Sequence, residues 1–334
     1  MDLSRHQQSS YTQILAAKQE IIWQRLAQVR LQDAYTQWLV TILNPLTKKT
    51  YQVAMEELFL RRFLDPDWTL QGFSLISPEM IIDRIKTEPI FVKARDGSLT
   101  TKQWSNPTRE SRIACFLAFT RYLHRKTEGI IRRGIPSKEG FEKTFGPKPR
   151  QVKTPAMNRS QLVRFFEQLD KINSRDALIA RVCLHGGKRI NEVLSLRTEQ
   201  LDYERKQITF HQSKSHLLDD ITIISFEKQA ASHLLEEIRK YIGERRGYVF
   251  ITSQGKNVQK TQVDRTFSKA GQQAGISFRV SAHTLRVTAV TLWKEDGFND
   301  SLIMKATGHA SSEMVRRYDK SDLADNVTKI SCLL

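Results

Sequence analysis

The sequence predicts a mainly α-helical protein with a small antiparallel β-sheet, divided into two domains. A length of 334 residues with 40% apolar residues suffices for two buried cores. Apolar residues recur at helical spacing over most of the chain, whereas strand-like runs gather between residues 206 and 252. A basic stretch rich in glycine and proline, 136–154, separates the two parts and is typical of a linker.

The first part, residues 21–135, is expected to be a helical domain. No strand-like alternation is recognised before residue 200, and residues 1–20 form a polar N-terminal segment. Breaks such as Asn44-Pro45 and the Ser77-Pro78 start divide this part into separate helices. Helical stripes are expected at 21–43, 50–63, 77–85 and 109–125.

The second part, residues 155–320, mixes helices with strands. It opens with Asn158 followed three residues later by Gln161, a capping-box pattern that predicts a helix start. Apolar spacing in 321–334 predicts a short C-terminal tail helix. Strands are expected at 206–211, 220–226 and 248–252, and further helices at 176–184, 228–242, 260–274, 283–296 and 299–307.

Composition favours a polyanionic partner. The net charge is +17 with a sequence pI near 9.8, and the excess is spread over both halves of the chain. The cysteines Cys115, Cys183 and Cys332 are far apart, which argues against a zinc site or a disulfide framework. No apolar signal segment or membrane-length stretch is present, so we expect a cytoplasmic protein without a membrane partner.

The segment after residue 280 contains a pattern suited to binding phosphate. His283 and Arg286 lie three positions apart at an expected helix start, with Ser281 placed to cap that helix. Helix N-termini favour anions because their N–H groups are unpaired. Gly308-His309 ends the next helix, and Tyr318 follows on a third, which also carries Arg316 and Arg317. These residues predict a phosphate cage with a tyrosine nearby.

Two further residues precede this segment in the chain. Arg189 comes directly after the Gly186-Gly187 break and starts a helix, with Glu192 three residues on. Lys214 lies in the polar turn between the first two expected strands. Alone, each of these residues would be an ordinary surface or capping residue.

Taken in order, these motifs resemble the tyrosine recombinases, the phage integrase family that includes the Xer and Cre proteins. The resemblance extends more narrowly to the integrase-like proteins carried by chlamydial plasmids. The match rests on Gly187 through Glu192, the H-x-L-R motif, and the spacing of nine positions between His309 and Tyr318. Two positions depart from the family pattern. Lys188 stands where an apolar residue is usual, and Lys214 lies in S-K-S-H, with Lys206 as a competitor.

The resemblance implies a helical DNA-clamping domain followed by an α+β catalytic domain that performs transesterification at a DNA phosphodiester. The Tyr318 hydroxyl would attack phosphorus, leaving a 3′-phosphotyrosine and a free 5′-hydroxyl. The family's remaining roles would fall to residues that neutralise charge or move protons. Arg189 and Arg286 would grip the phosphate, Lys214 would be the general acid, His283 and His309 would assist, and Glu192 would orient Arg189 or His283. No metal or other cofactor is expected, because the cations do the work of a metal ion.

The implied partner is double-stranded DNA, held by a homotetramer closed over two DNA sites. The tail helix would pass to a neighbouring subunit, although docking on its own domain is also open. Two alternatives remain: a DNA-binding regulator of plasmid maintenance or replication on the same fold, and a type IB topoisomerase. Basic residues expected to contact DNA are Lys143, Lys148, Arg150, Lys153, Arg316 and Arg317.

Overall fold

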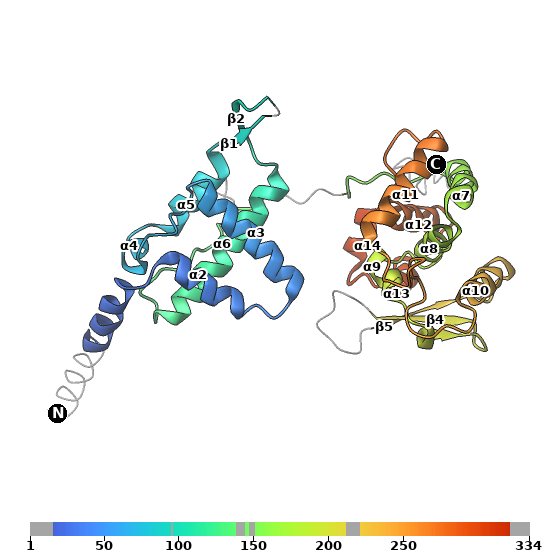
Figure 1. The fold of residues 1–334 in the computed structure, drawn as a ribbon, viewed down its shortest axis with the longest axis horizontal. Helices are drawn as coiled ribbons and strands as arrows, with labels where there is room; N and C mark the ends of the chain where they lie inside the picture. Colours follow the sequence, from blue (N-terminus) through green and yellow to red (C-terminus); the bar gives the residue numbers. More distant parts are fainter. Residues whose placement is uncertain (1–15, 95, 138–143, 147–150, 212–220, 321–334) are drawn as a thin grey trace, which may run out of the picture. The chain divides into compact units, whose positions relative to one another are not determined.

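A computed structural model describes residues 16–94, 96–137, 144–146, 151–211 and 221–320 (Figure 1). The chain separates into two compact units, Met1–Pro147 and Lys148–Leu334. The division falls inside the stretch 136–154 that the sequence predicts as a linker. The finer segment limits stay predictions. The tail helix at 321–334 also stays a prediction, because it lies outside the described residues.

The N-terminal unit is built on α6, whose 21 residues cross its core. Ser105 caps this helix, and Phe116 and Phe119 on it are fully buried. The Trp38 ring packs 5.1 Å from the Phe119 ring, joining α2 to α6. The stripe expected at 21–43 forms two helices, because the chain turns at 27–30 and bridges to Thr69. The helices are 16–26, α2 (Leu31–Val40), α3 (Pro45–Leu60), α4 (Leu70–Ser74), α5 (Pro78–Thr87) and α6 (Asn106–Lys126).

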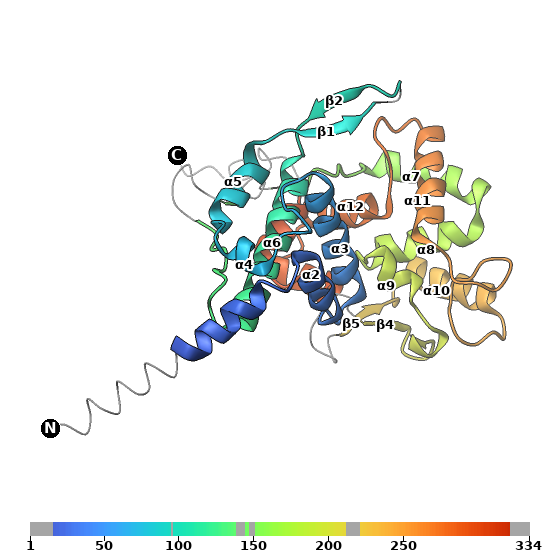
Figure 2. The ribbon, with the colours of Figure 1, turned by 60° about the vertical axis from the view of Figure 1, so that its left-hand side comes forward.

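A two-stranded hairpin also belongs to this unit, so the absence of strands expected before residue 200 is wrong. β1 (Ile90–Lys93) pairs antiparallel with β2 (Leu99–Lys102), and the hairpin projects away from the helices of its unit (Figure 2). Phe91 and Leu99 are exposed. Because most of this ribbon faces solvent, its sequence lacks the buried alternation that marks a strand.

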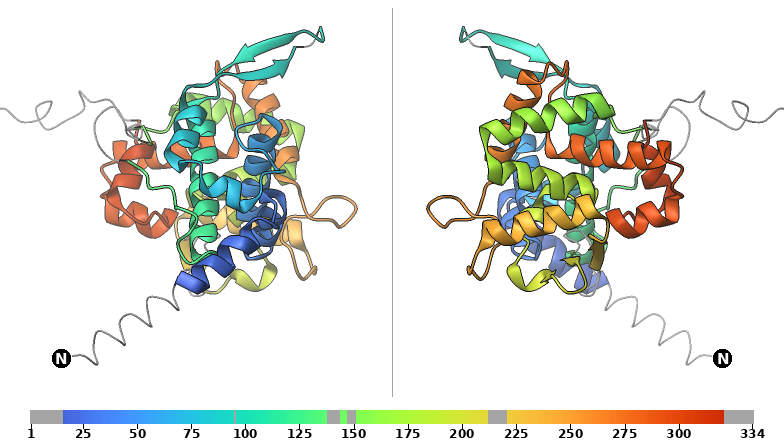
Figure 3. Two further views of the ribbon diagram at one scale, coloured as in Figure 1. Left: turned by 90° about the vertical axis from the view of Figure 1, so that its left-hand side faces the viewer. Right: turned by 90° about the vertical axis from the view of Figure 1, so that its right-hand side faces the viewer.

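The C-terminal unit is arranged around α8. This helix contacts α7, α10 and α12, and it lies between α7 and α10 (Figure 3). The capping box of Asn158 and Gln161 forms as predicted, and the Phe165 and Phe267 rings join α7 to α11. The helices are α7 (Arg159–Ile172), α8 (Ser174–His185), α9 (Ile190–Leu194), η2 (Thr198–Gln200), α10 (Gln229–Ile242), α11 (Lys260–Gln273), α12 (Ala282–Glu295), α13 (Asp300–Thr307) and α14 (Ser312–Tyr318).

One edge of this unit is a three-stranded antiparallel sheet in the order β3-β4-β5. β4 (Gln207–His211) and β5 (Ile221–Ser225) match the first two expected strands, whereas β3 (Leu201–Asp202) was not expected and the strand expected at 248–252 is wrong. Tyr248 and Ile251 form only isolated bridges. The predicted class, mainly α with small antiparallel sheets, is confirmed. Among the described residues, no helix is long and apolar enough to cross a membrane.

Candidate active site

Arg189 is held by the helix that it starts. It is the N-cap residue of α9, and its backbone N–H donates to Glu192 Oε2 at 3.0 Å. Its Nη1 donates to Glu192 Oε1 at 2.8 Å. Glu192 is buried, so this carboxylate fixes the direction of the guanidinium. Of the two partners that the sequence left open for Glu192, the structure places Arg189 against it.

Arg286 is the largest fully buried side chain among the described residues and is 1% exposed. It lies in the first turns of α12, which Ser281 caps as expected. Its Nη1 donates to the carbonyls of Gly187 at 2.6 Å and Thr307 at 3.0 Å. Its Nε and Nη2 are buried and have no hydrogen-bond partner within the described ranges. Burial, and secondly Arg189, lower the pKa of Arg286 to about 10.

Gly187 is required by this arrangement. Its φ is +56°, a left-handed conformation that glycine adopts readily. A Cβ at this position would lie 2.8 Å from Thr307 Cγ2 and 3.0 Å from the Trp293 ring. The glycine therefore lets α12 and α13 approach the loop whose carbonyl binds Arg286.

His309 lies directly after α13, which ends at Gly308 in the left-handed conformation. The Thr307 hydroxyl donates to the Ile303 carbonyl at 2.7 Å and lies 2.9 Å from His309 Nδ1. The hydroxyl has one hydrogen, so when it donates to Ile303 it accepts from the Nδ1–H of His309, and when it turns to Nδ1 the ring hydrogen lies on Nε2. Burial, followed by Arg286 and Arg189, lowers the pKa of His309 to about 3. His309 is thus a neutral ring whose buried Nε2 has no hydrogen-bond partner among the described residues.

Tyr318 is the last residue of α14 and is 9% exposed. Its ring centroid lies 4.7 Å from that of His309 and 5.3 Å from that of His283. The Arg286 guanidinium carbon lies 5.6 Å from the Tyr318 ring centroid. Thr291 Oγ1 donates to the Tyr318 carbonyl at 3.3 Å, which ties this end of α14 to α12.

These side chains surround a pocket of about 300 Å³. Its lining holds several cationic groups and one carboxylate, Asp264, and Glu192, the buried carboxylate beside it, is already paired with Arg189. Such a pocket suits an anion. The described residues contain no group of three or more His, Cys, Asp and Glu side chains able to hold a metal ion. The pocket is lined by Lys188, Arg189, Ile190, Asn191, Lys260, Asp264, Ser281, Ala282, His283, Arg286 and Tyr318.

The structure therefore brings Arg189, His283, Arg286 and Tyr318 to one pocket, with His309 packed against the tyrosine. Lys153 and Arg316 are exposed, Arg317 is half-buried, and none of the three lines the pocket. The sequence missed Lys188 and Thr307 as neighbours of this site. The unusual charge at Lys188 was the available signal. Outside the described residues lie Lys214, Lys143, Lys148 and Arg150.

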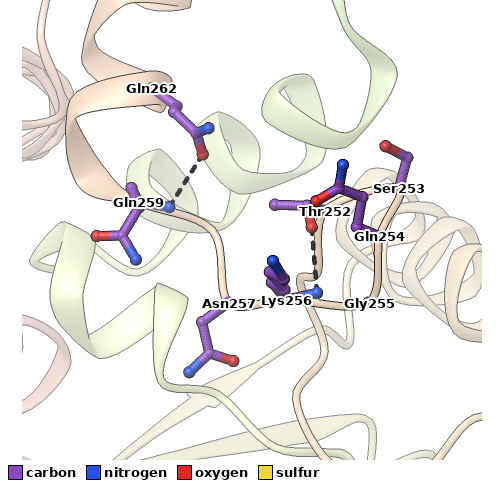
Figure 4. A pocket seen from close by; sticks show the side chains of 8 residues that line it. All are labelled: Thr252, Ser253, Gln254, Gly255, Lys256, Asn257, Gln259 and Gln262. Atoms are coloured by element: carbon purple, nitrogen blue, oxygen red, sulfur yellow. Dashed lines mark hydrogen bonds between the residues drawn. The ribbon is translucent and has the colours of Figure 1, made fainter.

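A larger hollow of about 660 Å³ lies in the loop before α11 (Figure 4). The backbone N–H of Lys256 donates to Thr252 Oγ1 at 3.1 Å, and that of Gln259 donates to Gln262 Oε1 at 3.2 Å (Figure 4). Its lining is polar, with Lys256 as its charged side chain, and it contains no histidine, carboxylate or tyrosine. The groups able to react gather in the smaller pocket.

Comparison with known proteins agrees with this geometry. Residues 155–324 match the phage integrase family. The chain is 40% identical over 328 residues to the virulence plasmid integrase pGP8-D of Chlamydia muridarum (strain MoPn / Nigg), covering 97% of this chain and 94% of that protein. The Tn1549 transposon integrase in complex with transposon right end DNA has a similar fold, with a TM-score of 0.65, 13% identity, and coverage of 89% and 96%. So does a lambda integrase tetramer bound to a Holliday junction, with a TM-score of 0.61, 14% identity, and coverage of 87% and 78%.

The fold and these relatives define a tyrosine-type site-specific recombinase. The chain belongs to the phage integrase family, and its relatives include integrases of chlamydial plasmids. The resemblance found in the sequence is confirmed.

Proposed function

We propose that this recombinase cuts and rejoins double-stranded DNA through a covalent bond to Tyr318. The Tyr318 oxygen forms a bond to phosphorus while the bond from phosphorus to the 5′-oxygen breaks. The tyrosine proton leaves, and the 5′-oxygen takes up a proton. The observation that carries the proposal is the position of Tyr318 at an anion-binding pocket, between two histidines and the buried Arg286. The 3′-phosphotyrosine is itself a phosphodiester, so a 5′-hydroxyl can attack it and reverse the step.

The residues around Tyr318 then have separable roles. Arg189 and Arg286 neutralise the charge that develops on the non-bridging oxygens, and Glu192 orients Arg189. His283 accepts the tyrosine proton, and His309 donates from an Nε2–H to the phosphate when the Thr307 hydroxyl donates to Nδ1. Lys214, from the turn between β4 and β5, gives the proton to the leaving oxygen; this role rests on the family resemblance.

DNA binding is proposed to use both units, with the N-terminal unit as the clamping half. The net charge of +17 and the solved relatives bound to DNA support this. Neutralising the linker cations should reduce the slope of log affinity against log salt by about one unit for every phosphate that the linker no longer neutralises. An unchanged slope would leave the linker a passive tether. The residues to change are Lys143, Lys148, Arg150 and Lys153.

The assembly is proposed to be a homotetramer on two DNA sites, acting in the cytoplasm where it meets its DNA. A solved relative is a tetramer on a Holliday junction. Residues 321–334 are proposed to dock on a neighbouring subunit. Truncation after Lys320 should abolish the four-subunit complex while single subunits still bind a half-site. Assembly and strand exchange that both survive truncation would contradict the exchange of tails.

The activity itself is tested with a nicked suicide duplex that carries a candidate recombination site. A recombinase should become covalently attached to the DNA and survive denaturing electrophoresis as a shifted band. A DNA-binding regulator on the same fold would bind the duplex without forming that band. The Tyr318→Phe variant should bind with unchanged affinity and form no adduct.

A further inference from the structure

Lys188 is a buried lysine beside the active pocket, in the loop between α8 and α9 that directly precedes Arg189. Its side chain is 1% exposed. A Cβ on Gly186 would lie 2.9 Å from Lys188 Cγ, so the glycine makes room for the lysine stem. The Lys188 Nζ donates to Thr222 Oγ1 and lies 4.8 Å from the Phe210 ring centroid.

The contacts of Lys188 place its amine at one end of the β4–β5 hairpin. Phe210 and Thr222 are opposite each other in the antiparallel register, and His211 and Ile221 form the next pair. That pair is the last among the described residues, and the segment 212–220 that follows His211 contains Lys214, Asp219 and Asp220. Lys188 therefore extends from the arginine loop to the hairpin end where the family resemblance places its catalytic lysine.

Among the described residues, no carboxylate is paired directly with the Lys188 ammonium. No ion pair within 4.0 Å involves Lys188 in the part of the chain that the structure describes. Both oxygens of the nearby Glu192 accept hydrogen bonds from Arg189. Burial lowers the pKa of Lys188 to about 7; Glu192 opposes this shift, whereas Arg286 and Arg189 add to it. The other titratable groups around the same pocket are His283, His309, Asp264, Lys260, Cys183 and Tyr318.

A phosphate in the pocket would supply the missing negative charge. Lys188 lines the same pocket as Arg189, Arg286 and Tyr318. An anion near a buried amine favours the charged form of that amine. We propose that Lys188 is a further functional residue of this site, which takes up a proton when the scissile phosphate binds and neutralises its charge together with the two arginines. This inference rests on the proposed function of the pocket.

The affinity of the pocket for phosphate should depend on pH through the protonation of Lys188. Above about pH 7 the amine in the empty pocket is mostly neutral, so phosphate binding must be accompanied by proton uptake. Affinity of the pocket for phosphate then weakens as the pH rises, until the phosphate-bound pKa is passed. Well below pH 7 the amine is already charged, so Lys188 takes up no further proton when phosphate binds.

Three variants separate this role from a packing role. Lys188→Met keeps an unbranched stem in the same space and removes the charge. Lys188→Arg keeps a cation at every working pH. Lys260→Met is the matched control, because Lys260 lines the same pocket but is exposed.

The direct test follows lysine side chains by NMR in the full-length protein labelled at lysine Cε, from about pH 5 to about pH 10. One signal, absent in Lys188→Met and present in Lys260→Met, should titrate near pH 7. Saturating inorganic phosphate should raise its midpoint by about one unit or more. A midpoint in the ordinary lysine range without phosphate would overturn the proposal. So would a midpoint that phosphate does not move, or a pocket that binds no phosphate, as judged from the His283 signals.

Adduct formation on the suicide duplex gives the second readout. Lys188→Met should slow it by about 10- to 100-fold, whereas Lys188→Arg should be less sensitive to rising pH than the wild type. Equal pH profiles for the wild type and Lys188→Arg would contradict proton uptake by Lys188. The NMR titration needs no strand cleavage, so failure of the recombinase proposal would leave its result interpretable.

Discussion

Two arginines, one in each unit, differ in how the surrounding protein balances their charge. In the N-terminal unit, Arg112 on α6 donates from Nε and Nη2 to one oxygen of Glu57 on α3, at 2.8 and 2.6 Å. Its side chain is 12% exposed. In the C-terminal unit, Arg286 is more deeply buried, yet it forms no ion pair with a carboxylate among the described residues, and its Nη1 donates to two backbone carbonyls. The more buried cation has the weaker internal compensation.

This difference separates a structural charge from one kept for a ligand. A buried cation without a carboxylate costs free energy, and it persists where a bound anion offsets that cost. Arg112 joins two helices and is neutralised within the protein. Arg286 retains unpaired N–H groups beside Tyr318, as a phosphate-binding residue requires. The comparison predicts opposite mutational signatures for the two arginines.

The largest effect is expected for Arg286→Met. Loss of this guanidinium should reduce covalent adduct formation by about 1,000-fold, since it removes a buried donor to the phosphate. The melting temperature should change little, because relief of the buried charge offsets the loss of two hydrogen bonds to carbonyls. Adduct assays and thermal unfolding on the same preparation check both parts. A protein that no longer folds would make Arg286 structural.

Arg112→Met should show the reverse signature. It leaves Glu57 half-buried without its partner, so the free energy of unfolding should fall by about 1–3 kcal/mol. The folded fraction should form adduct at the wild-type rate. Denaturant unfolding measures the first quantity and single-turnover cleavage the second. If Arg112→Met slowed cleavage without changing stability, the two arginines would no longer differ in the way proposed.

Thr307→Val should have a smaller, specific effect on His309. The change keeps the side-chain volume but removes the hydroxyl that bonds to His309 Nδ1, so the ring tautomer is no longer held by Thr307. Adduct formation should slow by about 10-fold, and Thr307→Ser should restore it. The ¹⁵N shifts of His309 report the tautomer. A ring tautomer that is the same in the valine variant and the wild type would remove this role from Thr307.

The smallest effect is a gain in stability from Lys188→Met. The folded-state pKa of about 7 lies below the ordinary value of 10.5, so the unfolded chain binds the extra proton between these values. The lysine therefore destabilises the fold increasingly as the pH falls from about 10 to about 7. The melting temperature of Lys188→Met should exceed that of the wild type at pH 7, with a smaller difference near pH 10. A difference in melting temperature that does not change with pH would mean that Lys188→Met acts through packing alone.

Much of the pocket was predictable because its residues follow strong local signals. Ser281 caps α12, Arg189 follows a glycine break, and Gly308 ends α13, so each functional side chain has a defined place on its element. Helical periodicity predicted most helices of the C-terminal unit for the same reason. That these residues meet near Tyr318 was predicted from the order of the motifs along the chain.

What the sequence missed depends on distant contacts. The burial of Lys188 requires Thr222 and Phe210 from the hairpin, and a lysine in a polar loop gives no sign of them. The function of Thr307 depends on hydrogen bonds to Arg286 and His309 that no periodicity encodes. The β1–β2 hairpin was missed because Phe91 and Leu99 face solvent.

The central claim is that Tyr318 becomes bonded to the 3′-phosphate of DNA. The most direct measurement digests the protein–DNA adduct with nuclease and protease and maps the attached nucleotide by tandem mass spectrometry. We expect the nucleotide to remain on Tyr318, and we expect Tyr318→Phe to give no modified peptide while still binding the duplex. A nucleotide attached to any other residue, or an adduct formed by Tyr318→Phe, would contradict it.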